Sequence, residues 1–126
     1  MLTENLALAI AIEQFNSGDY YACHDTLEEI WHEAWHEERG FYQGILQVAV
    51  GLYHLKNRNW RGAMILLGEG ISRLPDYEPS YQGMMVTPLR NAAIEILAQV
   101  QQAYQQGEGA LELYRSVVVM PQIIRE

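Results

Sequence analysis

Apolar residues recur at intervals of three and four along most of this chain, which is the spacing of helices that bury one face. The first such stretch covers residues 8–15 and ends before Gly18. The second runs over residues 19–35, has an acidic outer side, and begins at Asp19, a residue that suits an N-cap. The pattern therefore predicts two amphipathic helices joined by a short polar break.

Residues 38–55 form a third stretch, and this one is apolar around most of its circumference. Such a helix is surrounded by neighbours, so we expect it to be the central helix of the fold. Glu37 and Glu38 favour the positive N-terminal end of this helix, and His36 favours the end of the preceding one. We therefore predict a tight turn at residues 37–39 and an antiparallel helix hairpin around it.

Asn59 is a suitable N-cap for a fourth helix over residues 60–74, in which three glycines predict close helix contacts or a local break. Residues 75–86 lack a period and predict a long ordered loop whose tyrosines pack over the core. Thr87 and Pro88 predict the start of a fifth helix that continues to about residue 104. After it we expect a short turn at 111–114 and extended chain over 116–124 that lies in a groove.

These elements predict an all-α fold: residues 1–126 as a single-domain multi-helix bundle of about five helices, with the third helix at its centre and an extended C-terminal tail. The length of 126 residues and a hydrophobic content of 49% suffice for one core.

Charge and cysteine content narrow the functional classes. Sixteen acidic against eight basic residues give a net charge of -8, which opposes nucleic acid and anionic membranes. No segment has the roughly 18 consecutive apolar residues of a membrane span, and the N-terminus lacks a signal-peptide pattern. The lone cysteine, Cys23, requires no oxidising compartment, and we expect it to be a buried structural thiol. We expect a soluble cytoplasmic protein, with a protein partner or a second copy as open possibilities.

The chemically most informative residues are His24, Glu28 and His54. His24 and Glu28 are four residues apart and share a helix face. In a hairpin that turns at 37–39, His54 of the third helix lies opposite His24. Histidine and carboxylate side chains from facing helices are the means by which bundles hold metal ions. A divalent metal is thus the cofactor that this set would hold, and a small polar ligand is the other occupant.

Several further side chains complete the expected pocket: Trp31, Gln43, Gln47, Trp60 and Arg61. The alternative is a buried hydrogen-bond network that fixes the register of the helices and binds nothing. His32 and His36 drift away from the His24 face and are expected on the surface. The tryptophans, and the tyrosines at 20, 21, 42 and 53, have helical spacing and are expected in the core.

The motifs themselves are familiar. The runs are His24-Asp25-Thr26-Leu27-Glu28-Glu29-Ile30-Trp31, Phe41-Tyr42-Gln43-Gly44-Ile45-Leu46-Gln47, His54, and Asn59-Trp60-Arg61-Gly62-Ala63. With these runs the chain resembles the domain of unknown function 309 family from about Phe15 to the tail. The resemblance implies a compact all-helical domain, and members have been catalogued as predicted metal-dependent hydrolases.

Carried over position by position, the signature polar residues of that family fall on His24, Glu28, Trp31, Gln47 and His54. Asp25 stands where many members have glutamate, which keeps the charge but shortens the reach of the side chain.

Three hypotheses follow. In the first, the constellation is a structural network or a site for a small ligand or partner. In the second, the chain is a metal-dependent hydrolase in which His24, Glu28 and His54 hold a divalent ion that activates water. In the third, an exterior surface mediates assembly with itself or a partner. We favour binding or structure, because two imidazoles and one carboxylate leave no separate general acid or base. Catalysis and substrate stay open.

Overall fold

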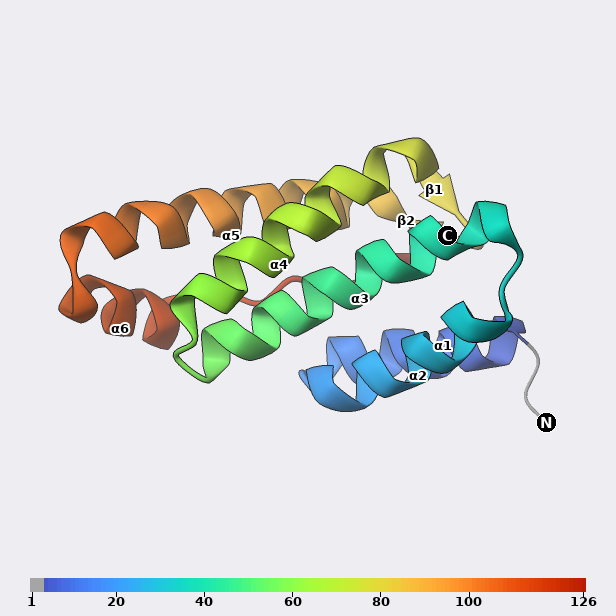
Figure 1. The fold of residues 1–126 in the computed structure, drawn as a ribbon, viewed down its shortest axis with the longest axis horizontal. Coiled ribbons are helices and arrows are strands. Elements are labelled where there is room, and N and C mark those ends of the chain that lie inside the picture. Colours follow the sequence, from blue (N-terminus) through green and yellow to red (C-terminus); the bar gives the residue numbers. More distant parts are fainter. Residues whose placement is uncertain (1–3) are drawn as a thin grey trace.

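The computed structural model describes residues 4–126, and within them six α-helices account for most of the chain (Figure 1). The helices are α1 (Glu4–Asn16), α2 (Tyr20–Glu33), α3 (His36–Lys56), α4 (Trp60–Arg73), α5 (Val86–Gln106) and α6 (Glu108–Val117). A 3-10 helix, η1 (Leu74–Tyr77), and three two-residue strands, β1 (Ser80–Tyr81), β2 (Met84–Met85) and β3 (Ile124–Arg125), complete the fold. The predicted all-helical class is confirmed, with six helices in place of five.

Helix α3 is the centre of the fold, as its apolar circumference predicts. It packs against α2 on one side and α4 on the other, and these are the two most extensive helix contacts in the described chain. Phe41, Val48, Leu52 and Leu55 of α3 are fully buried. Each of the other helices packs mainly on its neighbours in chain order, so α1 and α2 lie on one side of α3 and α4 on the other (Figure 1).

Close backbone contact between α3 and α4 explains why α4 tolerates glycine. A Cβ atom at Gly70 would lie 2.9 Å from the carbonyl oxygen of Gly44 and 3.0 Å from the amide nitrogen of Val48. Both of those atoms belong to the backbone of α3, so they cannot move aside as a side chain could. The predicted close helix contacts are confirmed here, and they fix how far apart the two helices lie.

The turn between α2 and α3 lies earlier than the sequence predicts. Ala34 and Trp35 are extended, with ψ values of 152° and 150°, and α3 begins at His36. The predicted turn at 37–39 and the placement of His36 at the end of the second helix are therefore wrong. Glu37 and Glu38 do occupy the first turn of α3, where the helix dipole favours carboxylates.

Segment 75–86 is ordered, as predicted, but it contains the 3-10 helix and a small hairpin. The rings of Tyr77 and Tyr81 lie 5.5 and 4.8 Å from that of Phe41, so these tyrosines cover the core. Helix α5 begins at Val86, and no side chain caps it. The start predicted from Thr87 and Pro88 is thus slightly late, and the Thr87 hydroxyl does not cap the helix but donates to the Glu78 carboxylate at 3.3 Å.

Residues 108–117 form helix α6, where the sequence predicts only a short turn followed by extended chain. Val117, at the end of this helix, is β-branched, and β-branched residues have a low helix propensity. The local sequence therefore favours extended chain here. Gly107, at φ 111°, separates α5 from α6 with a backbone conformation that glycine adopts without strain.

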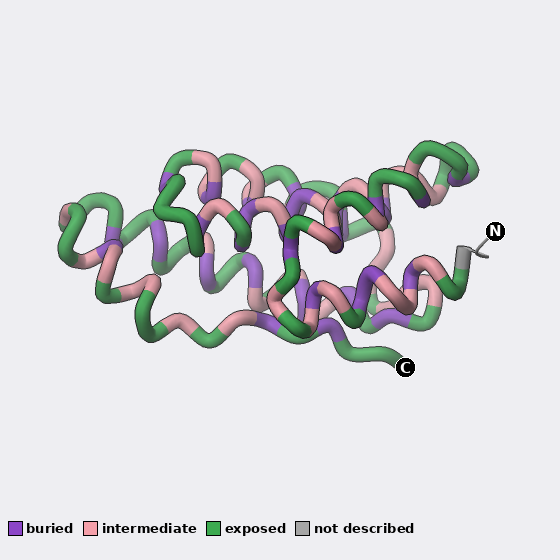
Figure 2. The backbone as a smooth tube through the Cα atoms, turned by 90° about the horizontal axis from the view of Figure 1, so that it is seen from below, coloured by how far each residue is buried: buried purple, intermediate pink, exposed green. Residues whose placement is uncertain are grey.

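The chain after α6 is extended, and hydrogen bonds join its end to the rest of the fold. The side-chain amide of Asn16, at the end of α1, donates to the carbonyl of Ile123 at 3.0 Å and accepts from its N–H at 2.7 Å. Strand β3 then pairs antiparallel with β2. Figure 2 shows the largely exposed tail with a buried stretch near its end, where Ile123 is 4% exposed. The predicted extended tail is confirmed over its last residues.

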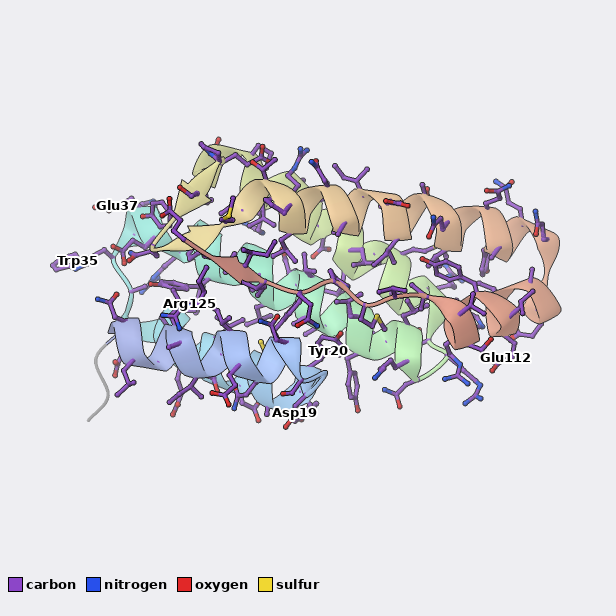
Figure 3. All side chains as sticks on the ribbon, turned by 180° about the vertical axis from the view of Figure 1, so that it is seen from behind. Asp19, Tyr20, Trp35, Glu37, Glu112 and Arg125 are labelled. Carbon is purple, nitrogen blue, oxygen red and sulfur yellow. The ribbon has the colours of Figure 1, made fainter. Side chains whose placement is uncertain are left out.

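Burial corrects part of the aromatic prediction. Trp60, Tyr20 and Tyr42 are buried as expected, whereas Trp35 is 75% exposed. Figure 3 shows the Trp35 side chain pointing away from the molecule at the end of the α2–α3 hairpin. Trp35 precedes the first residue of α3 and no longer follows the periodicity of α2, so its helical spacing is misleading.

Among the described residues, no helix is long and apolar enough to cross a membrane.

The α3–α4 contact predicts opposite effects for alanine at two glycines of the same helix. Gly70→Ala should lower the free energy of unfolding by about 1–3 kcal/mol, because the added methyl group meets α3 backbone. Gly68→Ala is the matched control, since the nearest atom to its Cβ is Leu97 Cδ2 at 3.9 Å. It should raise stability by about 0.5–1 kcal/mol. Urea denaturation measures both, and equal effects would contradict this packing.

Candidate functional site

His24 and Glu28 pair on the outer side of α2, as the four-residue spacing predicts. His24 Nε2 lies 3.2 Å from Glu28 Oε2, and His24 Nδ1 lies 3.1 Å from Asp25 Oδ1. Carboxylates only accept hydrogen bonds, so both contacts are satisfied together when both ring nitrogens carry a hydrogen. His32 Nε2 approaches the other Glu28 oxygen at 3.9 Å. Glu28 thus lies between two histidines of its own helix.

His54 belongs to a different group of contacts. Its Nδ1 lies 3.3 Å from the Nδ2 of Asn59, the residue that caps α4. The side-chain oxygen of Asn59, Oδ1, accepts from the Gly62 N–H at 3.0 Å. The side-chain nitrogen of Asn59 is therefore the atom that faces His54. An amide nitrogen only donates, and His54 Nδ1 therefore acts as an acceptor here. His54 supports the turn between α3 and α4.

His54 does not join His24 and Glu28 in a three-residue ligand group among the described residues. The ring centroids of Tyr21 and Tyr53 are 5.6 Å apart, and Lys56 lies over the Tyr20 ring. His54 is thereby level with the region of Tyr20, about one helical turn from His24. The turn at Ala34 and Trp35 also lies earlier than predicted, and these contacts do not place His54 directly opposite His24.

A series of ring contacts through two tyrosines links the two histidines. His24 lies 6.0 Å from Tyr21, Tyr21 lies 5.6 Å from Tyr53, and Tyr53 lies 5.9 Å from His54, measured between centroids. The two tyrosine rings therefore connect the imidazoles through successive contacts. Tyr21 is 59% and Tyr53 36% exposed, so both rings reach solvent at the seam of α2 and α3. The prediction that these two tyrosines belong to the core is wrong.

The arrangement does not fit the divalent metal that the sequence suggests. In the part of the chain that the structure describes, no group of three His, Cys, Asp or Glu side chains is placed to hold a metal ion. His24 directs both ring nitrogens at carboxylates, while the Nδ1 of His54 faces an amide. A metal bound by His24 and His54 would have to displace these contacts.

Gln47 lies in a network between α3 and α4, away from His24. It is 6% exposed, donates to Glu69 Oε2 at 3.0 Å and accepts from Arg73 Nε at 3.1 Å. Both functions of its amide are therefore satisfied by residues of α4. This part of the predicted constellation is an interhelical hydrogen-bond network, the structural alternative stated above.

The other expected pocket residues are also dispersed. Arg39 lies 5.0 Å over the Trp31 ring, and its Nε donates to the Ala34 carbonyl, so both side chains pack at the α2–α3 turn. Trp60 donates its ring N–H to Glu108 of α6 at 3.1 Å. Arg61 is exposed on α4, and Gln43 is half-buried on α3. None of these four joins His24 and Glu28 in a common pocket.

Some of the relevant partners leave weak signals in the sequence. Tyr21 follows the buried Tyr20 and lies about 100° around the helix from it, so helical geometry alone places one of the two off the buried face. Asn59 both caps α4 and contacts His54. The sequence pattern predicts the cap but not the contact with His54. Glu69 and Arg73 become partners of Gln47 only once the α3–α4 register is known.

Cys23 is fully buried, as expected for a structural thiol. Burial, with a smaller contribution from the charge of Asp19, raises the pKa of Cys23 to about 12. Burial likewise raises the pKa of Tyr20, which neighbours this thiol, to about 12. Both groups are therefore held in their neutral forms, and Cys23 has no role as a nucleophile at neutral pH.

These pKa shifts predict a loss of stability in alkali. The folded pKa of Cys23 lies above the value of about 8.5 for a free thiol, so the unfolded chain releases its proton first. The contribution is complete below that value and falls as pH rises toward 12. Denaturant titrations should show this decline, with a shallower slope for Cys23→Ala. A thiol reagent at pH 8 should modify Cys23 only after unfolding, and rapid labelling of the native protein would contradict this.

Comparisons with known proteins find two uncharacterised bacterial relatives and one family model. The chain is 29% identical over 109 residues to the uncharacterised protein YpuF of Bacillus subtilis, a match that covers 86% of this chain and 59% of that protein. An uncharacterised protein of Aquifex aeolicus is 25% identical over 84 residues, covering 66% of this chain and 25% of its own length. The chain thus spans well under two thirds of either relative. The family model described as a domain of unknown function, DUF309, matches residues 8–66, which include all of α2 and α3. This match confirms the resemblance stated from the motifs over residues 8–66, which is a little under half of the chain.

Proposed function

We propose that this chain is a cytoplasmic, non-catalytic binding module, and that a patch on α2 and α3 binds a positively charged segment of a protein partner. The patch consists of Tyr21, His24, Glu28 and Tyr53, and we call it the Tyr21 patch. The observation that carries the proposal is the pair of tyrosine rings, exposed by 59% and 36% and 5.6 Å apart, from two different helices.

Exposed tyrosines are common anchors of protein interfaces, because they offer a large rigid contact area and a hydroxyl group. Here the Tyr21 ring lies next to His24, which contacts the carboxylates of Asp25 and Glu28. These two carboxylates are 64% and 51% exposed. The electron-rich face of an aromatic ring attracts lysine and arginine side chains, and the carboxylates can accept their hydrogen bonds. Together with the net charge of -8, this chemistry favours a cationic partner.

The remaining signature residues support a structural role beside this patch. Gln47 and His54 are each engaged in contacts that tie α3 to α4. Their task in this account is to hold the orientation of α3, on which the position of Tyr53 depends. The metal-dependent hydrolase, our alternative hypothesis, has no three-ligand group among the described residues to support it.

A peptide titration followed by NMR tests the proposal. Isotope-labelled protein is titrated with an N-acetylated, C-amidated peptide of alternating arginine, lysine and glycine, and separately with its glutamate counterpart. We expect saturable shifts at α2 and α3 with the basic peptide alone. Tyr21→Ala should weaken binding about tenfold, the effect of losing a contact of about 1.4 kcal/mol.

Tyr104→Ala is the matched control, because Tyr104 is a tyrosine of α5 that is 45% exposed. It should leave the affinity for the basic peptide unchanged. Equal losses in the two variants, or shifts that spread over all acidic surfaces, would show non-specific charge attraction and refute a defined patch.

A further inference from the structure

An open groove lies between helices α5 and α6, and it is separate from the Tyr21 patch. Its volume is about 750 Å³, and its walls are formed by α5, α6 and the first residues of the tail. Ala92, Ile96 and Ala103 contribute from α5, and Leu113 and Val117 from α6. In its lining the Tyr114 hydroxyl donates to the side-chain carbonyl of Gln99 at 2.7 Å. Burial, and to a lesser degree the charge of Glu95, raises the pKa of this tyrosine to about 12.

Helix α6 has a second apolar side that faces solvent at this groove. Leu111 is buried against the rest of the fold, at 2% exposure. Leu113 and Val117, by contrast, are 65% and 64% exposed, and a spacing of four residues puts them on one side of the helix. Val119, just beyond the helix, is 87% exposed. A cluster of exposed aliphatic side chains of this kind marks an interaction surface.

The charged residues of α6 all have partners away from this apolar side. Glu108 accepts from the Trp60 ring N–H, and Glu112 accepts from Arg58 at 2.7 Å. Arg115 donates to Glu112 and to the Lys56 carbonyl. The hydrogen bonds from Arg58 and Arg115 hold the pKa of Glu112 below its usual value, so this carboxylate stays ionised and paired. The groove side of α6 is thereby left without a charge.

The α5 side of the groove is nearly neutral as well. Between residues 92 and 106 the sequence has one charged residue, Glu95, and its carboxylate accepts from the Gln99 side chain at 3.2 Å. Gln102 and Gln106 contribute uncharged amides to the lining. In a chain of net charge -8, most surfaces repel a second copy, whereas this one does not. Glutamine amides both donate and accept, so they can pair with their own counterparts across a two-fold axis.

We propose that two copies of this chain associate through the α5–α6 groove, with Leu113 and Val117 of each copy packed against the other. Two antiparallel helix pairs would then form a four-helix arrangement. The contact strip is roughly 20 Å by 20 Å, on the order of 400 Å² for each copy, against about 800 Å² in a typical stable interface. The association is accordingly weak and depends on concentration.

Analytical ultracentrifugation of the full chain between about 10 and 500 μM tests this proposal. The weight-average mass should rise toward twice 14.5 kDa in the wild type. The double variant Leu113→Glu, Val117→Glu should remain at 14.5 kDa, because it places like charges across the two-fold axis. Ile65→Glu is the matched control, since Ile65 is an aliphatic residue of α4 that is 55% exposed, and it should associate like the wild type. A monomeric wild type at the highest concentration, or an equal loss in the control, would overturn the proposal.

A disulfide experiment keeps the test valid if the double variant fails to fold. Cys23 is buried, so a cysteine introduced at position 113 supplies the reactive thiol of the native protein. Leu113→Cys should give a covalent dimer under mild oxidation, and Ile65→Cys should not. Comparable crosslinking in both would indicate random collision and refute the interface. A wild-type monomer that binds an apolar amphipathic peptide at this groove would also refute it, since a different occupant would then be identified.

Discussion

Backbone contact between α3 and α4 is the constraint on which the rest of this structure depends. With a Cβ at Gly70 the helices could not approach as they do, because Gly44 and Val48 present main-chain atoms there. Once α4 lies this close, Gln47 is within reach of Glu69 and Arg73, and their hydrogen bonds fix the register of the two helices. The hydrogen bonds of Gln47 therefore stabilise a helix contact that apolar packing creates. α3 is consequently held rigidly enough to position residues on its opposite side.

The polar residues that mark the family acquire separate tasks from this arrangement. Gln47 joins α3 to α4, His54 faces the cap of α4, and Trp31 lies under Arg39 at the α2–α3 turn. Only His24 and Glu28 remain together, on an exposed side of α2. A spacing pattern suggestive of a metal site can thus arise from several structural requirements in one helical hairpin. The surfaces that we propose for interaction are the tyrosine pair at the α2–α3 seam and the weakly charged groove of α5 and α6.

Local features were predictable from the sequence, because short-range chemistry determines them. Asp19 and Asn59 cap their helices as expected, and the periodicity locates α1 to α5 to within a few residues. The α2–α3 register was not predictable, since it depends on two extended residues, Ala34 and Trp35, that carry no turn signal. In the observed packing Tyr53 lies beside Tyr21 and His54 contacts Asn59, and no group of three metal ligands forms among the described residues. Helix α6 was missed because its valine-containing end favours extended chain locally, while packing against α5 determines its helical state.

The central claim is that His54 contacts Asn59 apart from the His24–Glu28 pair, and that the three residues do not share a metal ion. Elemental analysis by mass spectrometry tests it most directly. Purified untagged protein is incubated with zinc, manganese or iron salts and dialysed, alongside His24→Ala and His54→Ala variants. The account predicts no stoichiometric metal that depends on both histidines. One bound metal per chain in the wild type, lost in each variant, would contradict it.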